Sequence, residues 1–365
     1  MRLDFFPSRR LTLYLGTTFV VRILAVLAML VMILQVLDLL GESGKILAAD
    51  GNGQAQLLTY ASLRIPQLVA RFLPYSVLLA TIITLSTLNQ NSEVIAMKAS
   101  GLSAHQILAP LVLTALLIAG VSFAFNERVV TRATATLSAW QKADYGPVPE
   151  TDGALANIYM VEDNDILSAR LATGTGDTMQ LSGVVWYRRD PTLMLAEQWR
   201  ADTARWTGDG WLLSRPSRFR VASASEEQMA DTTVARGISP SEIEISNVNA
   251  DAQNLGQLSQ SIEALDRAGR RTDELKAKWW HKISGPLSAA LMPLLGAVAG
   301  FGLARSGQLF VRAIIGMALG FAFFVVDNAA LAIGNFGGYP PFLAAWAPFL
   351  LFLLIGEMVL IRTEE

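Results

Sequence analysis

The sequence is dominated by apolar runs that are long enough to cross a lipid bilayer as helices. A helix rises 1.5 Å per residue, so about 20 apolar residues span a hydrocarbon core of about 30 Å. The first run is 11–40, where only Arg22, Gln35 and Asp38 are strongly polar. Five more follow, at 65–88, 107–125, 283–303, 309–333 and 342–361. Because an unsatisfied backbone group in lipid costs several kcal/mol, all six should be transmembrane helices.

Composition supports a membrane protein and excludes several classes of function. Of the 365 residues, 52% are apolar and 16% are charged, which is too apolar for most soluble enzymes. The formal net charge of −2 provides no basic stripe for nucleic acid. The absence of cysteine excludes disulfides and thiolate chemistry, and His105 and His281 are too few for a histidine-rich metal site.

The charged residues divide the chain and orient it. Most of them lie between Glu127 and Trp280, so a soluble domain interrupts the membrane spans. Basic residues in short loops stay cytoplasmic, and their counts favour a cytoplasmic N-terminus. The inner segments then contain Arg2, Arg9, Arg10, Lys98, Arg305, Arg312 and Arg362, and the outer short segments contain Lys45, Arg64, Arg71 and Lys282. Both termini and the loop 89–105 are therefore expected in the cytoplasm, and the inserted block outside it.

The inserted block has the pattern of an all-β domain. Apolar and polar residues alternate over 158–161, 165–171, 179–187 and 219–221, with turn signals at 173–177 and 189–191. A further turn signal predicts a hairpin that joins 204–206 to 211–213, with the sequence Thr207-Gly208-Asp209-Gly210 between the two strands. Strands at this spacing predict a β-sandwich or jellyroll over about 155–250.

A helix is expected after the strands. The stretch 258–278 has helical periodicity, with Ser259 or Ser261 as its N-cap, and it leads back to the membrane. The predicted organisation is therefore three spans in 1–126, an extracytoplasmic domain in 127–280 and three spans in 281–365.

No motif for catalysis is present. The nearest match to a P-loop, Gly41-Glu42-Ser43-Gly44-Lys45-Ile46, lacks both the spacing and the closing hydroxyl. H-E-x-x-H, G-x-S-x-G and paired intramembrane aspartates on facing helices are also missing. The chain is thus expected to be non-catalytic, with a role in transport or assembly.

One cytoplasmic segment has the features of a docking helix. Asn91 or Ser92 can cap a helix of about 91–101, with Glu93 near its positive end and Gly101 at its stop. The candidate contact residues are Glu93, Val94, Ile95, Met97 and Lys98, which could fit the groove of a partner. An ordinary interfacial connector is the alternative.

Two further sets of polar residues are candidates for function. Lys45, Arg64 and Arg71 should lie near the outer membrane surface, where basic side chains suit lipid phosphates or snorkel to the interface. Asp327 interrupts the fifth span, and pairing with a basic residue is favoured over a proton relay because no further carboxylates accompany it.

Several motifs resemble those of the LptF/LptG permeases of the lipopolysaccharide exporter. They are Asn91 to Gly101 (NSEVIAMKASG), Trp280 to Ser288 (WHKISGPLS), Val325-Val326-Asp327-Asn328 and Gly338-Tyr339-Pro340-Pro341. The resemblance covers three spans, a periplasmic β-jellyroll and three spans, which is essentially the whole chain. The end of the first span, Val36 to Leu40, is more similar to LptG than to LptF.

The resemblance implies a subunit of an ABC transporter in the bacterial inner membrane. Its implied partners are an LptF-like permease, two LptB-like ATPase subunits that bind ATP and magnesium, and an LptC-like membrane-anchored protein. This chain would need no cofactor of its own. Together the subunits would extract lipopolysaccharide and pass it to a periplasmic bridge.

Individual residues acquire expected roles from the same resemblance. Glu93 matches the acidic position of the coupling helix, so 92–100 would transmit motion from the ATPase. Lys45 would contact lipid A phosphates, and Arg64 and Arg71 are inferred to share this role. The first and fifth spans would form lateral gates.

Other functions remain open on the sequence alone. A permease of another ABC exporter, for lipid or lipoprotein, is the nearest alternative and usually carries four spans. An intramembrane hydrolase would need a catalytic dyad, and a simple anchor for a periplasmic domain would need no short cytoplasmic helix.

Overall fold

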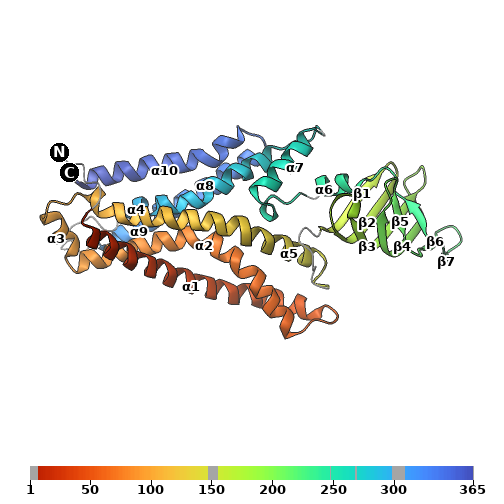
Figure 1. Cartoon of the computed structure of the whole chain (residues 1–365), viewed down its shortest axis with the longest axis horizontal. Helices are drawn as coiled ribbons and strands as arrows, with labels where there is room; N and C mark the ends of the chain where they lie inside the picture. The colour runs from red at the N-terminus through yellow and green to blue at the C-terminus, as the bar shows by residue number, and fades with distance from the viewer. Residues whose placement is uncertain (1–6, 147–154, 247, 268, 298–308, 365) are drawn as a thin grey trace. The chain divides into compact units, whose positions relative to one another are not determined.

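The computed structural model describes residues 7–146, 155–246, 248–267, 269–297 and 309–364 (Figure 1). The chain forms two compact units. The helical unit comprises Met1–Asp38, Ile65–Val130 and Asn254–Glu365. The β unit comprises Leu39–Arg64 and Thr131–Gln253. These boundaries differ from the predicted domains, because Leu39–Arg64 groups with the β unit and the chain from Asn254 groups with the helices.

Five helices in the described part of the chain are long and apolar enough to cross a membrane. They are α1 (Arg9–Ala48), α2 (Gln54–Gln90), the stretch Ala104–Lys142, α9 (Leu309–Asn335) and α10 (Pro341–Glu364). The stretch Ala104–Lys142 consists of α4 (Ala104–Phe125), a π-helical turn η1 (Asn126–Val130) and α5 (Thr131–Lys142). A multi-pass helical membrane protein is thus confirmed. The predicted fourth span begins in α8 (Asp273–Gly296) and continues into residues outside the described ranges, so the count of six stays a prediction.

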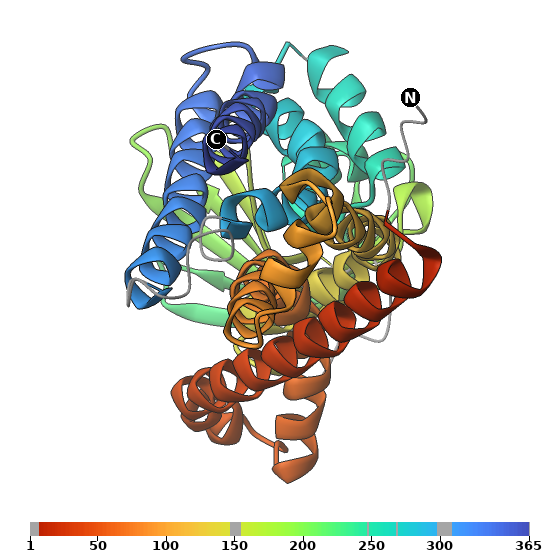
Figure 2. The same ribbon diagram turned by 90° about the vertical axis from the view of Figure 1, so that its left-hand side faces the viewer.

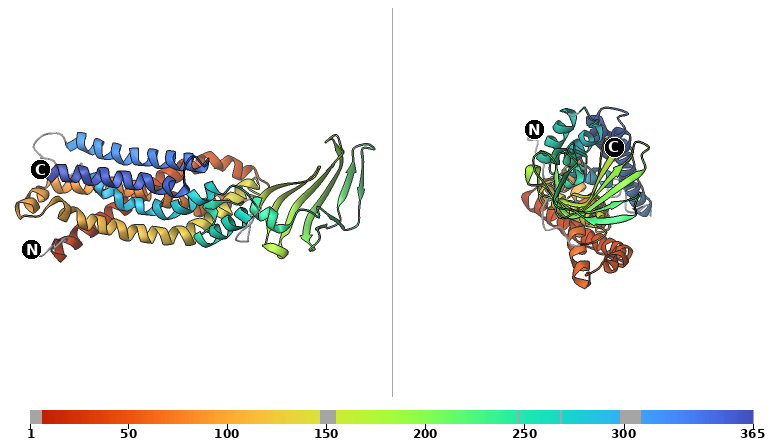
Figure 3. Two further views of the ribbon diagram at one scale, coloured as in Figure 1. Left: turned by 90° about the horizontal axis from the view of Figure 1, so that it is seen from above. Right: turned by 90° about the vertical axis from the view of Figure 1, so that its right-hand side faces the viewer.

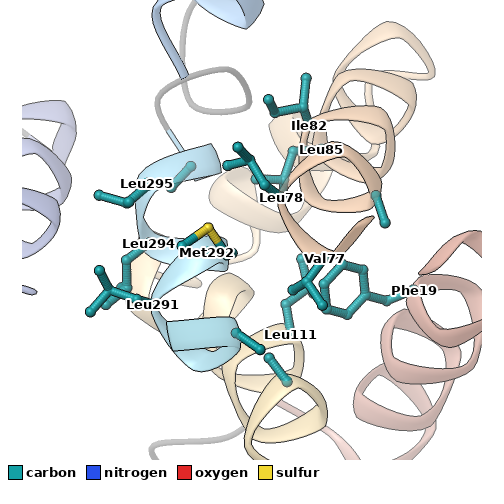
Figure 4. Packing of buried hydrophobic residues seen from close by; sticks show 14 of the residues in the cluster. Phe19, Val77, Leu78, Ile82, Leu85, Leu111, Leu291, Met292, Leu294 and Leu295 are labelled. Atoms are coloured by element: carbon teal, nitrogen blue, oxygen red, sulfur yellow. The ribbon is translucent and has the colours of Figure 1, made fainter. Parts of the chain in front are cut away.

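Apolar side chains from α1, α2, α4 and α8 meet in the core of the helical unit. Figure 4 shows Phe19 of α1 beside Val77 of α2, with Leu111 of α4 close by and Met292 of α8 opposite. All four are buried. The long apolar runs in the sequence therefore also supply a protein core, in addition to faces that can meet lipid.

Glycines bring neighbouring helices of this unit into close contact. A Cβ atom added at Gly296 of α8 would lie 2.8 Å from Thr81 Cγ2 of α2. One added at Gly320 would overlap Leu78, and one added at Gly334 would overlap the Cβ atom of Ala344. Small residues at such positions allow helix backbones to approach closely.

α1 contacts the helical unit along one row of side chains. Five of its buried residues recur at every fourth position, Leu15, Phe19, Ile23, Leu27 and Val31, and Val26 is buried beside this row. A row at this spacing is inclined to the helix axis, so α1 lies obliquely on its neighbours, as its red ribbon does in Figure 2. Most other apolar residues of α1 are exposed, among them Val21, Leu24, Met32, Val36 and Leu37.

The β unit contains an antiparallel sheet, which confirms an inserted β domain (Figure 3). Its strands are β1 (Leu155–Glu162), β2 (Asp165–Thr173), β3 (Gln180–Arg189), β4 (Leu195–Trp206), β5 (Trp211–Leu213), β6 (Ser217–Arg220), β7 (Ser225–Gln228) and β8 (Thr232–Val234). The main path runs β1-β2-β3-β4-β5-β8. The sheet forks at β4, where residues 197–200 pair with β6 and residues 204–206 pair with β5. The predicted hairpin between β4 and β5 is present.

Tryptophans organise the core of this sheet. Trp186 and Trp199 are cross-strand partners on β3 and β4, and both are buried. Trp211 is fully buried, and its indole N–H donates to the carbonyl of Ile238 over 2.7 Å. Glu162 accepts a hydrogen bond from the N–H of Gly237, so the segment after β8 lies against the end of β1. The described strands end at Val234, before α6 (Pro240–Ser246), rather than near residue 250.

The predicted helix over 258–278 is wrong, because the chain forms two helices there. α7 (Leu255–Arg267) is capped by Asn254, whose side chain accepts from the N–H of Gln257, rather than by Ser259 or Ser261. It ends in a Schellman motif: Gly269, at φ +67°, donates to Asp266 O and Arg270 donates to Leu265 O. α8 begins four residues later at Asp273. The glycine at the left-handed position ends the first helix, although the apolar periodicity continues.

The C-terminal end of α1 and the N-terminal end of α2 pack on α5 within the β unit. Ile46, Tyr60, Leu137 and Trp140 form a buried cluster with Tyr145. The Tyr145 hydroxyl donates to Glu42 Oε2 over 2.7 Å, and its carbonyl accepts from Asn52 over 2.7 Å. Both helices therefore extend beyond the apolar runs that the sequence identified.

Candidate functional site

A short helix, α3 (Glu93–Ala99), is present within the segment of about 91–101 that was predicted to be helical. Ser92 is its N-cap residue, as expected, but Ser92 is left-handed at φ 60° and its side chain makes no capping hydrogen bond. Glu93 occupies the first turn, where a carboxylate interacts favourably with the helix dipole, and Lys98 occupies the last turn. The helix is therefore short but favourably charged at both ends.

The C-terminal end of α3 is fixed to α4 by two consecutive motifs. Gly101, at φ +90°, donates to Lys98 O, and Leu102 donates to Met97 O, which is a Schellman motif. Ser103 then begins α4 with a capping box, because its side chain accepts from Gln106 N while its own N–H donates to the Gln106 side chain. Two residues thus change the chain direction without leaving the flanking backbone groups unpaired.

Burial divides the candidate contact residues into two groups. Val94 and Met97 are 4% and 8% exposed and belong to the core of the helical unit. Ile95 is 50% exposed, Lys98 is exposed and Glu93 is half-buried. Val94 and Met97 therefore attach α3 to its own chain, and Glu93, Ile95 and Lys98 are accessible to a partner.

Glu93 is oriented by two neutral donors. Asn91 Nδ2 lies 3.3 Å from Glu93 Oε1, and the Tyr14 hydroxyl of α1 lies 3.3 Å from Glu93 Oε2. Among the ion pairs between described residues, none involves Glu93. The Glu93 carboxylate is thus held in place by neutral groups, and its negative charge can still attract a basic side chain of a partner. Sequence spacing provides no signal for Tyr14, because it lies 79 residues from Glu93.

The basic residues predicted to lie near the outer surface divide between the two units: Lys45 and Arg64 belong to the β unit, and Arg71 and Lys282 belong to the helical unit. Lys45 is 67% exposed on α1 and lies 3.0 Å from Glu42. On α2, Arg64 is half-buried and Arg71 is exposed. Lys282 is 13% exposed and lies 3.9 Å from Glu127, which also accepts a hydrogen bond from Leu255 N. Lys282 therefore joins η1, α7 and α8, whereas the first three remain accessible.

Asp327 has a basic partner that the sequence did not identify. His281 Nε2 of α8 lies 3.0 Å from Asp327 Oδ2 of α9, and the Asp327 side chain is 13% exposed. A Cβ atom on Gly285, one turn after His281, would lie 3.3 Å from the imidazole, so glycine leaves room for the ring. The other histidine is also paired, because His105 Nε2 of α4 lies 3.3 Å from Glu357 Oε2 of α10.

No other cluster suggests a chemical reaction. In the described ranges, His, Asp and Glu do not gather in groups of three or more that could hold a metal ion. A pocket of about 630 Å³ lies in the β unit between the β1–β2 turn, β3, β4 and residues 232–236. Its wall residue Arg188 is already paired with Asp165 and Glu197. The helix α3 is therefore the candidate site with accessible and preorganised groups.

Comparison with known proteins agrees with this arrangement. The family described as "Lipopolysaccharide export system permease LptF/LptG" matches residues 13–362. The lipopolysaccharide export system permease protein LptG of Escherichia coli K12 is 25% identical over 313 residues, which are 83% of this chain and 84% of that protein. The LptG protein of Haemophilus influenzae Rd is 22% identical over 317 residues, which are 85% and 87% of the two chains.

Proposed function

The chain belongs to the LptF/LptG family of lipopolysaccharide export system permeases, and from this premise we propose how it works. It is a non-catalytic transmembrane subunit of an ABC transporter, and ATP hydrolysis belongs to a separate subunit. We propose that the chain extracts lipopolysaccharide from the outer leaflet of the inner membrane and passes it to a periplasmic bridge. The observation that carries the proposal is α3, with its accessible Glu93.

The proposed orientation places α3 in the cytoplasm and the β unit in the periplasm. It is supported by the excess of Lys and Arg in the segments that this orientation makes cytoplasmic. Both chain termini then lie in the cytoplasm. α3 is thereby accessible to a cytoplasmic ATPase.

We propose that α3 is the coupling helix. Val94 and Met97 anchor it in the core of the helical unit, so a force on its accessible face moves the chain rather than the helix alone. Glu93 presents an oriented carboxylate for a basic side chain of the ATPase, and Ile95 and Lys98 lie on the accessible surface beside it. Closure of the ATPase would then be transmitted as a rigid-body displacement.

An external energy source is required by the chemistry of the substrate. Each CH₂ group that leaves the bilayer costs about 0.8 kcal/mol, so several acyl chains far exceed thermal energy. A permease that binds lipid in a cavity and then closes it under force can overcome this cost. ATP and magnesium bind to the partner ATPase, and no cofactor is assigned to this chain.

The proposed assembly pairs this chain with an LptF-like permease over two LptB-like ATPase subunits, with an LptC-like membrane protein attached. Support for a second permease comes from the exposed apolar faces of α1 and α9, which include Val36, Leu37, Phe321 and Val325. These two helices are the proposed lateral gates. Lipid or the second permease would cover their exposed faces.

The proposed contacts to lipid phosphate are Lys45, Arg64 and Arg71. Lys45 and Arg71 are exposed, and a basic side chain forms charge-assisted hydrogen bonds with phosphate oxygens. Lys45 would exchange its exposed contact with Glu42 for a phosphate. Asp327 is assigned a pairing role with His281 and no part in proton transfer.

The test of the coupling proposal is Glu93→Arg in the complete transporter. Reversal of the charge should prevent recruitment of the ATPase and stop lipid export, because two cations would then face each other. The measurement is the amount of ATPase that co-purifies with the permease. Glu226→Arg, at an exposed position of β7, is the matched control and should retain the ATPase. Normal co-purification with Glu93→Arg would contradict the proposal.

A further inference from the structure

The carboxylate of Glu93 has capacity for more contacts than the described residues supply. An ionised carboxylate offers about four acceptor sites. Asn91 uses one on Oε1, and Tyr14 uses one on Oε2. A basic side chain of a partner can therefore bind Glu93 while the Tyr14 contact persists.

Tyr14 lies where α1 meets the rest of the helical unit. It precedes Leu15, the first residue of the buried row on α1, and is itself 47% exposed. Because α1 contacts the helical unit mainly along this row, a polar contact near the N-terminal end of α1 has a large effect on the position of the helix. α1 also makes a polar contact with α2, from Arg22 Nη1 to the carbonyl of Ile83, at 3.3 Å.

α3 and α1 differ in how firmly they are held. α3 has two buried anchors and a Schellman motif that continues into the capping box of α4. α1 exposes most of its apolar surface. The two helices share one apolar core, and a direct polar contact between them adds a directional link through which α1 follows a displacement of α3.

We propose that Tyr14 is a positioning residue that links the docking carboxylate Glu93 to α1. This inference rests on the proposed role of α3 as the coupling helix. The Tyr14 hydroxyl orients Glu93 before docking and pulls α1 along when the ATPase displaces α3. The contact is exposed, and at 3.3 Å it is longer than the optimum of about 2.7–2.8 Å for O–H···O bonds, so it can form and break during each cycle.

The experiment is Tyr14→Phe in the complete transporter with its ATPase, reconstituted in proteoliposomes that contain lipopolysaccharide. The aromatic ring stays and only the hydroxyl is lost. The ATPase should remain bound within about twofold of the unsubstituted complex, because Glu93 is retained. The lipopolysaccharide released per ATP hydrolysed should fall about threefold or more, the factor expected for loss of one exposed hydrogen bond of ordinary net strength. A purely structural defect would lower ATP hydrolysis and lipopolysaccharide release together, so the amount released per ATP would stay unchanged.

Thr17→Val is the matched control on α1. The Thr17 hydroxyl bonds only to the Leu13 and Tyr14 carbonyls of its own helix, so its loss should leave the ratio unchanged. An unchanged ratio in Tyr14→Phe would overturn the inference. Loss of the ATPase from Tyr14→Phe, to the extent seen in Glu93→Arg, would also overturn it, because Tyr14 would then belong to the docking surface.

The two proposals fail separately. If Glu93→Arg retains the ATPase, the coupling role of α3 is wrong. If Glu93→Arg loses the ATPase while Tyr14→Phe keeps the normal ratio, only the link through Tyr14 is wrong.

Discussion

Asp327 lies inside a predicted membrane span, and its contact with His281 is explained by the cost of burying a charge. A buried carboxylate is tolerated when an oppositely charged or hydrogen-bonding group accompanies it. The sequence identified Asp327 as the residue that needs a partner. It could not identify His281, because the two lie 46 residues apart on different helices and no spacing rule connects them.

Removal of His281 should destabilise the chain by leaving Asp327 unpaired. We expect His281→Ala to cost about 1–3 kcal/mol, since His281 is one-third exposed and solvent reduces the full cost of a broken buried pair. The measurement is the Tm of the purified complex in detergent. The double variant His281→Ala with Asp327→Asn should recover part of the loss. If the double variant is less stable than the sum of the single changes, the pairing is not the cause.

Asp266 should make the corner between α7 and α8 sensitive to acid. Hydrogen bonds from Lys276 and then from Thr272 hold the pKa of its carboxyl below the ordinary value of 3.8. Because the folded-state pKa is the lower one, this stabilisation is complete above the unfolded pKa and is lost as pH falls through the folded pKa. Asp266→Asn should therefore lower Tm at pH 6, and the difference should shrink below about pH 4. A difference that stays constant with pH would contradict this assignment.

At the scale of helices, apolar runs predicted which segments are helical but not where they end. α1 continues to Ala48 and α2 begins at Gln54, because these two helix ends are stabilised by packing around Tyr145. The continuation of α4 through η1 into α5 was likewise invisible to hydropathy. For α3, the residue types predicted a helix that stops at Gly101. Which of its side chains are buried and which are accessible could be learned only from the packing in the structure.

The strands show the same limit of prediction. Alternating patterns and turn residues identified the segments that became β1 to β3, and the hairpin of β4 and β5. The fork at β4 was not predictable, because both arms have similar short patterns and pairing depends on contacts distant in sequence.

Gly334 provides a test of helix packing in the membrane unit. Gly334→Ala would place a methyl group into the Cβ atom of Ala344, which is fully buried on α10 and has no side-chain torsion to relieve the overlap. Overpacking of this kind costs about 1–3 kcal/mol, so Tm should fall. Gly120→Ala on α4 is the matched control, because its new Cβ atom would have no neighbour within 4 Å. An equal response of the two variants would contradict close packing of α9 on α10.

At the scale of the whole molecule, the proposed orientation can be tested with introduced thiols. The natural chain contains no cysteine, so each introduced one is unique. Ser223→Cys, in the turn between β6 and β7, should react with a thiol reagent that passes the outer membrane but not the inner one. Ala99→Cys, on α3, should react only after the inner membrane is broken. Both positions are exposed, so accessibility within the chain is matched. Labelling of Ala99→Cys in intact cells would exclude docking of a cytoplasmic ATPase there.

The single row of contacts along α1 determines which movements of this helix are easy. Sliding along the axis would lift five interdigitated side chains out of their grooves together, which interrupts many van der Waals contacts at once. Rotation of α1 about this row keeps those side chains in their grooves and changes only the direction in which the opposite face of the helix points. Within the helical unit, rotation about this row therefore disturbs fewer contacts of α1 than translation along its axis, and rotation changes which of its apolar side chains face outward.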